Sequence, residues 1–175
     1  MHINIEFKAT HASIADAERK LAALNPLFVG EDHQVDTYFN VPNGRLKLRE
    51  GTIEHALIFY QRSNSASAKQ SDVTLYQHEP DAALKTILAQ SIGIKTIVDK
   101  KRKIYFIDNV KFHFDRVTGL GEFVEVEAID KDGSIGIEKL KEQCRYYQHL
   151  LEVQDTDFIA ESYSDLLLAK KSSFA

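Results

Sequence analysis

Three cationic residues alternate with leucines in residues 44–50, which read GRLKLRE. This alternation predicts a β-strand that places Arg45, Lys47 and Arg49 on one face. Like charges on one strand face repel each other unless an anion lies among them. The row therefore indicates either a polar face in contact with water or part of an anion-binding site.

Other predicted strands carry polar faces of the same kind, and some of their charges are negative. Apolar and polar residues alternate in residues 3–8, 98–106, 110–115 and 123–127. A β-rich run ends at Arg62, and the polar loop after it contains Lys69. The alternating segments contribute these further charged residues: Glu6, Lys8, Lys100, Arg102, Asp115, Glu125 and Glu127.

Two architectures accommodate these faces. In an open two-layer α+β fold they would meet solvent, whereas in a closed barrel they would point inward beneath a coat of helices. If they converge, eight cations and four carboxylates share the interior of a chain whose net charge is −4. Such a cavity suits a compact polyanion, not a long nucleic acid. Divalent cations would have to lie between the carboxylates and phosphate, since Mg²⁺ characteristically bridges one or two carboxylates to substrate phosphates.

The sequence resembles the CYTH superfamily, the triphosphate tunnel metalloenzymes that include class IV adenylyl cyclases and thiamine triphosphatases. The motifs that carry this resemblance occur in chain order: NIEFK at 4–8, DTYF at 36–39, GRLKLR at 44–49, YQR at 60–62, Lys69 with Ser71 and Asp72, residues 98–105, and DRVTGLGEFVEVE at 115–127. The stretches VPNGRLKLRE and GLGEFVEVE look like the class IV adenylyl cyclase branch in particular. The resemblance implies a closed eight-stranded antiparallel β-barrel, with helices outside and a triphosphate along its tunnel. It also makes a homodimer plausible.

On this resemblance we expect a triphosphate to bind to Lys8, Arg45, Lys47, Arg49, Arg62, Lys69, Lys100 and Arg102. We expect the metal, Mg²⁺ or Mn²⁺, to bind to Glu6, Asp115, Glu125 and Glu127. Asp115, Lys8 and Arg62 are the expected catalytic residues. The chain departs from the family's ExExK motif at Asn4, which keeps an oxygen acceptor but loses a charge. This change should weaken the binding of a second metal ion.

Three functions fit these residues. In an adenylate cyclase the ribose 3′-hydroxyl attacks the α-phosphorus of ATP, and pyrophosphate leaves. In a triphosphatase water attacks the terminal phosphorus of inorganic triphosphate, thiamine triphosphate or a nucleoside triphosphate. The third possibility is a non-catalytic nucleotide or polyphosphate binder, which Asn4 would explain. The resemblance favours the cyclase. For His113, a hydrogen-bonded structural role is favoured over that of an acid or base.

The rest of the chain indicates a single domain over residues 1–175. It contains no apolar run of membrane-spanning length and no signal-peptide pattern, so we expect a cytoplasmic protein that does not bind a membrane. Its one cysteine, Cys144, excludes an internal disulfide and is expected to be a buried thiol. Helices are predicted at residues 13–24, 82–90, 137–151 and 158–169, and a short strand at residues 28–34.

Overall fold

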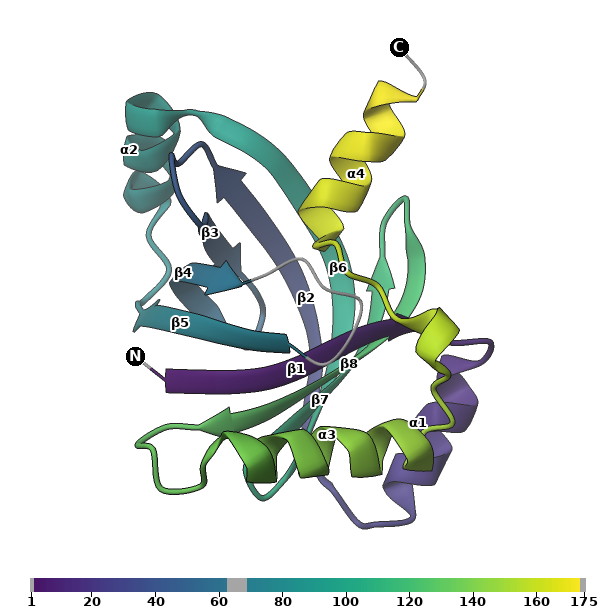
Figure 1. The fold of residues 1–175 in the computed structure, drawn as a ribbon. Helices are drawn as coiled ribbons and strands as arrows, with labels where there is room; N and C mark the ends of the chain where they lie inside the picture. The colour runs from purple at the N-terminus through teal and green to yellow at the C-terminus, as the bar shows by residue number, and fades with distance from the viewer. Residues whose placement is uncertain (1, 63–68, 174–175) are drawn as a thin grey trace.

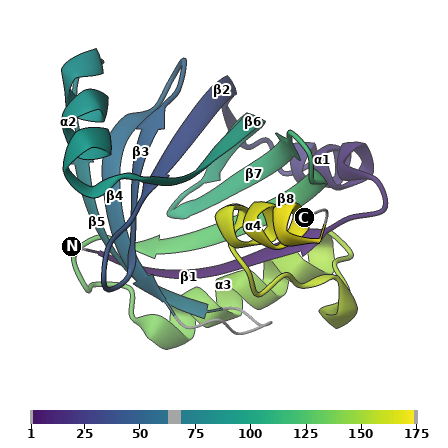
Figure 2. The same cartoon turned by 90° about the horizontal axis from the view of Figure 1, so that it is seen from above.

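The computed structural model describes residues 2–62 and 69–173, and its eight strands form one closed antiparallel sheet. The strand order is β1-β5-β4-β3-β2-β6-β7-β8, and β1 pairs with β8 to close the barrel. The elements are β1 His2–Thr10, α1 Ile14–Ala22, β2 Leu27–Phe39, β3 Arg45–Glu50, β4 His55–Arg62, β5 Lys69–Gln77, α2 Ala82–Ile92, β6 Ile94–Ile107, β7 Val110–Val117, β8 Gly121–Asp130, α3 Ile137–Leu150, a 3₁₀ turn at Asp155–Asp157, and α4 Tyr163–Ser172. The predicted α+β barrel is confirmed (Figures 1 and 2).

The main hydrophobic core lies outside the barrel, between the sheet and two helices. In Figures 1 and 2, α1 and α3 lie on one side of the closed sheet, away from α2. The outer faces of β1, β7 and β8 supply buried residues such as Phe7, Phe112 and Val126, against which Leu140 packs. Because strand side chains alternate between faces, packing these residues outward turns the polar residues between them into the barrel.

The local sequence explains how the covering helices begin and pack. The Ser13 side chain accepts a hydrogen bond from the backbone N–H of Asp16 and caps α1, as its position predicts. Cys144 is buried on α3, its thiol donates to the carbonyl of Ile5, and burial raises the pKa of the thiol to about 12. The predicted structural thiol is therefore confirmed.

Two element boundaries differ from the sequence prediction. The short strand expected at residues 28–34 continues to Phe39, because β2 pairs with β6 along nearly its whole length through two register shifts. The last helix starts at Tyr163 and not at Phe158, because Ser162 and Asp165 form a capping box there. The residues before the cap are extended, and the N–H of Ile159 donates to the carbonyl of Lys8 on β1.

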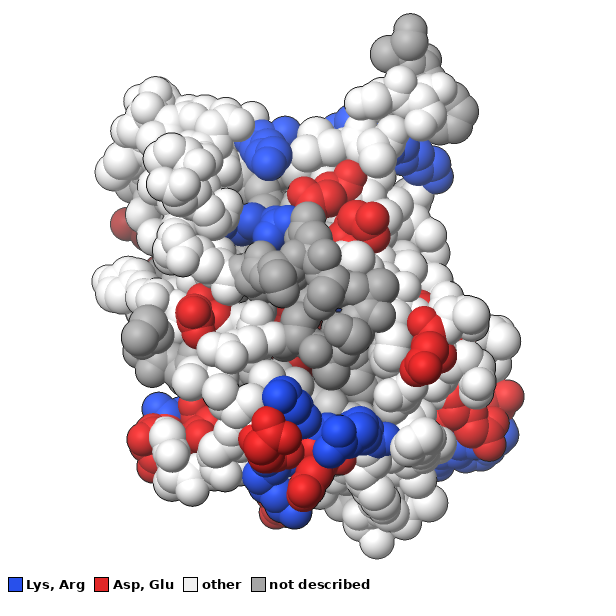
Figure 3. Space-filling view, viewed as in Figure 1, with Lys and Arg blue, Asp and Glu red and all other residues white. Residues whose placement is uncertain are grey.

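The outer surface carries charges of both signs. On the face in Figure 3, Lys and Arg lie next to Asp and Glu, most densely along the lower edge. Among the helices in residues 2–62 and 69–173, none combines the length and apolar character needed to cross a bilayer.

Candidate functional site

The barrel encloses a cavity with about 980 Å³ of space, including the part open to solvent. Among the side chains that the structure describes, six cations and five carboxylates line it. They are Lys8, Lys47, Arg49, Lys100, Arg102 and Lys111, and Glu6, Asp36, Glu54, Glu125 and Glu127. Two of the eight cations expected from sequence, Arg62 and Lys69, have side chains outside this description, so the six cations and five carboxylates are a count of the described side chains alone.

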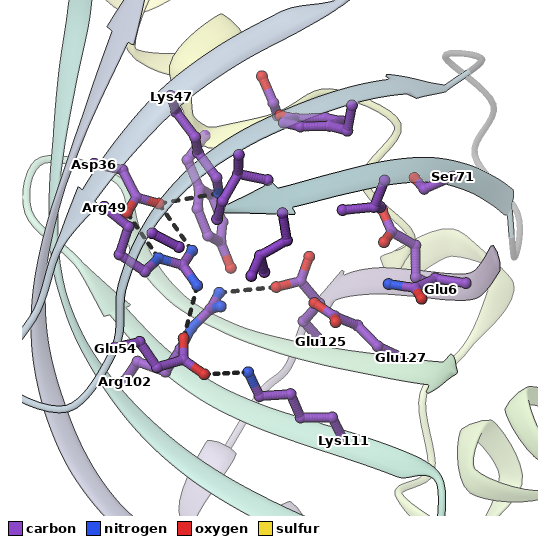
Figure 4. A pocket seen from close by; sticks show the side chains of 18 of the residues that line it. Glu6, Asp36, Lys47, Arg49, Glu54, Ser71, Arg102, Lys111, Glu125 and Glu127 are labelled. Carbon is purple, nitrogen blue, oxygen red and sulfur yellow. Dashed lines mark hydrogen bonds and ion pairs between the residues drawn. The ribbon is translucent and has the colours of Figure 1, made fainter. Parts of the chain in front are cut away.

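Three cations from β3 and β6 gather around one carboxylate, Asp36 of β2 (Figure 4). Arg49 lies directly opposite Asp36 and donates to both of its carboxylate oxygens, at 2.9 and 3.0 Å. The ammonium groups of Lys47 and Lys100 donate to the Oδ2 atom at 3.1 and 2.7 Å. Asp36 therefore holds the buried Arg49 and Lys100 and the partly exposed Lys47 close together, where a larger anion could contact them all.

The closeness of these charges shifts the pKa values of Asp36 and Lys100. Burial opposes charge on Asp36, but Arg49 and Lys100 hold its pKa well below the usual range. Burial lowers the pKa of Lys100 to about 7, and Arg49 and Arg102 act in the same direction against the opposing effect of Asp36. Asp36 and Glu54, which also accepts from Arg49, supply two negative charges to these three cations. The group would be stabilised by additional negative charge.

Arg102 connects the cationic group to the opposite side of the cavity. Its guanidinium donates to both oxygens of Asp115, at 2.6 and 2.5 Å, and to Glu125 at 2.8 Å. Asp115 is fully buried, also accepts from the Tyr163 hydroxyl at 2.7 Å, and is not among the residues that line the cavity. This placement departs from the expectation that Asp115 is a metal ligand or catalytic group. Its carboxylate instead orients Arg102.

The opposite side of the cavity is acidic. Glu6 on β1 lies directly across from Glu127 on β8, with Glu125 two residues away on the same face. Burial and the carboxylates of Glu125 and Glu6 raise the pKa of Glu127 to about 7. Burial also disfavours charge on Glu125, yet Arg102 and His113 hold its pKa well below the usual range.

These carboxylates fit a divalent cation. Ligand atoms of His113, Glu125 and Glu127 all lie within 4.8 Å of one another. Oxygen donors of this kind suit Mg²⁺ and Mn²⁺, and a cation would remove the repulsion that raises the pKa of Glu127. The His113 Nδ1 atom is 3.2 Å from Glu125, and burial lowers the pKa of His113 to about 3. The ring is therefore neutral, in keeping with the predicted hydrogen-bonded histidine.

Glu54, from the turn between β3 and β4, lies between Arg49 of β3 and Lys111 of β7 and binds both. It accepts from Arg49 at 2.8 Å and from the ammonium of Lys111 (Figure 4). The turn is held in place by Asp32, which accepts from the backbone N–H groups of residues 52, 53 and 54. Sequence reasoning missed Glu54 as a site residue, because a turn has no periodicity from which its direction can be read.

The other predicted phosphate-binding residues fall into three groups. Lys8 lines the cavity, donates to the carbonyl of Glu161 and lies 4.4 Å from the centre of the Tyr163 ring. Arg45 is not among the lining residues, and instead pairs with Asp165 of α4 at 2.8 Å. The side chains of Arg62 and Lys69 lie outside the part of the chain that the structure describes.

Other lining residues were not assigned to the site from sequence, among them Asp36, Lys111 and Tyr163. Asp36 lies within the DTYF motif quoted for the resemblance, so a signal was present. Lys111 alternates with Phe112 in β7 and shares the face of His113, which was also a usable signal. Tyr163 had none, because its position depends on how the segment before α4 crosses the end of the barrel.

Both the sequence and the fold of the chain are similar to those of known proteins. The sequence model of the CYTH domain matches residues 2–163. None of the curated proteins compared with the chain matches it significantly.

Solved structures share the fold at low sequence identity. A conserved hypothetical protein from Pyrococcus furiosus matches with a TM-score of 0.78 and 24% identity, over 93% of this chain and 99% of that one. A proposed adenylate cyclase from Vibrio parahaemolyticus matches with a TM-score of 0.74 and 17% identity, over 94% and 97%. A proposed adenylyl cyclase from Hippeastrum, described as having a dominant triphosphatase activity, matches with a TM-score of 0.62 and 13% identity, over 98% and 96%.

Proposed function

Because this chain belongs to the CYTH domain family, we propose that it is a metal-dependent enzyme that converts a triphosphate bound inside its barrel. The observation that carries this proposal is the division of the cavity into a cationic group around Asp36 and an acidic group of Glu6, Glu125 and Glu127. Transfer at phosphorus mainly requires that oxygens be positioned and developing charge be neutralised. Cations facing carboxylates that can hold a metal meet both requirements.

The cationic side would bind the phosphates. Arg49 and Arg102 present planar guanidinium groups that match pairs of phosphate oxygens, whereas Lys47 and Lys100 act as point charges. Asp36 and Asp115 fix both guanidinium groups through two hydrogen bonds each. Their geometry therefore requires little reorganisation when a substrate binds.

The acidic side would hold the metal through Glu6, Glu125 and Glu127. A bound Mg²⁺ or Mn²⁺ supplies charge neutralisation at phosphate oxygens. His113 keeps a neutral ring beside Glu125 and orients that carboxylate. Lys8 lies directly across from Glu125 on β1, which makes it the cation next to the metal ligands.

We assign adenylate cyclase as the first candidate reaction: ATP is converted to cyclic AMP and pyrophosphate. The VPNGRLKLRE and GLGEFVEVE stretches support it through their similarity to the class IV cyclases. Triphosphate hydrolysis is the second candidate, supported by the activity described for the Hippeastrum protein of the same fold. Binding without turnover is the third, because Asn4 stands where the family motif has a glutamate.

Product analysis by mass spectrometry separates these candidates. We expect ATP with Mn²⁺ to yield cyclic AMP and pyrophosphate. Orthophosphate released from ATP, thiamine triphosphate or tripolyphosphate, with no cyclic product, would identify a triphosphatase instead. Tight binding of these triphosphates without any product in either metal would leave a binding protein.

A further inference from the structure

The segment around the start of α4 is tied to the barrel and contributes Tyr163 to the lining of the cavity. Just before α4, the carbonyl of Glu161 accepts a hydrogen bond from the ammonium of Lys8 on β1. In the first turn of α4, Asp165 pairs with Arg45 of β3 at 2.8 Å. Tyr163 lies between these two ties in the chain, so its position relative to the strands is set from both sides.

The hydroxyl of Tyr163 is bonded to the carboxylate that holds Arg102. It donates to Asp115 Oδ2 at 2.7 Å, and the same oxygen accepts from Arg102 Nη2 at 2.5 Å. Both Tyr163 and Asp115 are buried, so water cannot readily take the place of the hydroxyl. The three side chains form one hydrogen-bonded chain that runs from α4 through β7 to β6.

Packing alone does not account for a tyrosine at this position. The centre of the Tyr163 ring lies 4.9 Å from that of Phe123 and 4.4 Å from the ammonium of Lys8. A phenylalanine would make both contacts. Only a tyrosine adds a hydroxyl, and here the hydroxyl meets a buried carboxylate whose charge requires hydrogen bonds.

The hydroxyl acts as a donor and not as an acid or base. Burial and the charges of Asp115 and Glu125 raise the pKa of Tyr163 well above its usual range. Burial also opposes charge on Asp115, but Arg102 keeps the pKa of this carboxyl below its usual value. Tyr163 therefore stays protonated while Asp115 stays ionised, and the hydrogen bond between them keeps one direction.

Arg102 is the cation on which this chain acts. It lines the cavity and also donates to Glu125, on the acidic side, at 2.8 Å. Its Nε and Nη2 atoms make these bonds and those to Asp115, whereas Nη1 bonds none of the residues that the structure describes. The direction in which Nη1 faces a ligand therefore depends on how firmly the Asp115 carboxylate is held.

We propose that Tyr163 is a positioning residue of the phosphate site: its hydroxyl fixes Asp115 and, through Asp115, the guanidinium group of Arg102. The start of α4 then contributes to phosphate binding, although the hydroxyl bonds a carboxylate and not the ligand. This inference rests on the proposed function, because it takes Arg102 to bind phosphate.

A double-mutant cycle tests this role, because residues that act through one another have non-additive effects. The probe is a non-cleavable methylene analogue of ATP with Mg²⁺, titrated by calorimetry. Tyr163→Phe should weaken its binding about tenfold, the scale of one hydrogen bond to a charged group. In an Arg102→Ala background the same substitution should change the affinity less than about twofold, since the group that Tyr163 positions is then absent.

Tyr147→Phe is the matched control, because it also removes one phenolic hydroxyl. Tyr147 packs against Phe112 outside the barrel and is not among the residues that line the cavity. This variant should leave the affinity unchanged in both backgrounds, and melting curves verify that each variant folds. Arg102→Ala leaves Asp115 buried without its cation. If that variant does not fold, Arg102→Gln combined with Asp115→Asn replaces it as the background, since this pair removes both charges together.

The outcomes separate the inference from the function on which it rests. An equal loss from Tyr163→Phe in both backgrounds would show that its effect does not pass through Arg102, and would overturn the inference. Binding by Tyr163→Phe that matches binding by Tyr147→Phe would also overturn it. Failure of the unaltered protein to bind the analogue would instead contradict the proposed function.

Discussion

At the scale of single residues, the site consists of cations whose positions are set by buried carboxylates. Asp36 fixes Arg49, and Asp115 fixes Arg102, each through two hydrogen bonds. A buried charge pair of this kind contributes little net stability, because desolvation offsets its attraction. In the proposed enzyme each pair serves to hold the guanidinium donors in place before a ligand binds.

Replacing Arg49 with Ala removes one of these fixed donors. We expect kcat/KM on the triphosphate substrate to fall about 10²–10³-fold, the range found when one preorganised donor is removed from a site. Arg116→Ala is the control, since Arg116 is exposed and pairs with Glu122 on the neighbouring strand. Steady-state assays that give equal rates for the two variants would contradict the assignment.

Restoring the family's carboxylate at position 4 should strengthen metal binding. Asn4 lines the cavity with Glu6, so Asn4→Glu adds a fourth carboxylate to the acidic group of Glu6, Glu125 and Glu127. We expect Mn²⁺ affinity to rise on the order of tenfold, because ligand charge count sets affinity in oxygen-donor sites. Electron paramagnetic resonance of free Mn²⁺ measures this directly. Asn4→Gln, which adds no charge, should leave the affinity unchanged, and an equal rise in both variants would refute the explanation.

Residue periodicity predicted which face a side chain is on, but not how far along the barrel it lies. Arg45, Lys47 and Arg49 share one face, as expected, yet only the last two line the cavity. Arg45 meets Asp165 of α4, a contact across 120 positions that no local pattern encodes. Asp115 was likewise placed on the correct strand, whereas its cover by Arg102 and Tyr163 depends on packing between distant segments.

At the scale of elements, the closed order of strands brings the two halves of the site together. The alternation of polar and apolar residues in β1, β3, β7 and β8 could be read from the sequence. A one-residue slip in any of these strands would exchange its core face with its polar face, so the pattern fixes which residues share a face. The residues alone accommodated both an open sheet and a barrel. Closure depends on pairing between β1 and β8, which lie at opposite ends of the sheet order.

The turn between β3 and β4 depends on one buried carboxylate. Asp32 accepts from the N–H groups of Thr52, Ile53 and Glu54, at 2.6, 2.9 and 3.1 Å. Asp32→Ala leaves these donors without their partner and should lower the free energy of unfolding by about 3 kcal/mol. Urea denaturation measures the change. Asp132→Ala removes an exposed carboxylate that accepts from the backbone N–H of Ser134 in a loop, and it should cost less than about 0.5 kcal/mol. Similar losses in the two variants would show that the turn does not depend on Asp32.

At the scale of the whole molecule, an acidic chain concentrates its cations in its interior. Its net charge is −4, while the cavity gathers six of its cationic side chains among those the structure describes. Because the surrounding cations and burial lower the pKa of Lys100 to about 7, this lysine is mostly neutral at pH 8. A bound polyanion raises that pKa again, so binding should take up a proton.

This proton uptake can be measured by calorimetry at pH 8 in two buffers that differ in ionisation enthalpy. We expect close to one proton to be taken up per triphosphate bound, and affinity should fall as pH rises above 7. Lys100→Arg is the matched variant, since arginine keeps its charge and should abolish the uptake. Equal uptake by both proteins would mean that another group titrates.

The central claim is that ionic side chains from separate strands form one site for a short chain of phosphates. The most direct measurement is the dissociation constant of a non-cleavable ATP analogue with Mg²⁺, compared with that of AMP, in the unaltered protein and in Arg49→Ala. We predict that the triphosphate binds at least about a hundredfold more tightly than AMP, and that Arg49→Ala removes most of this difference. Equal affinities for the two ligands, or a preference that survives in Arg49→Ala, would contradict the account.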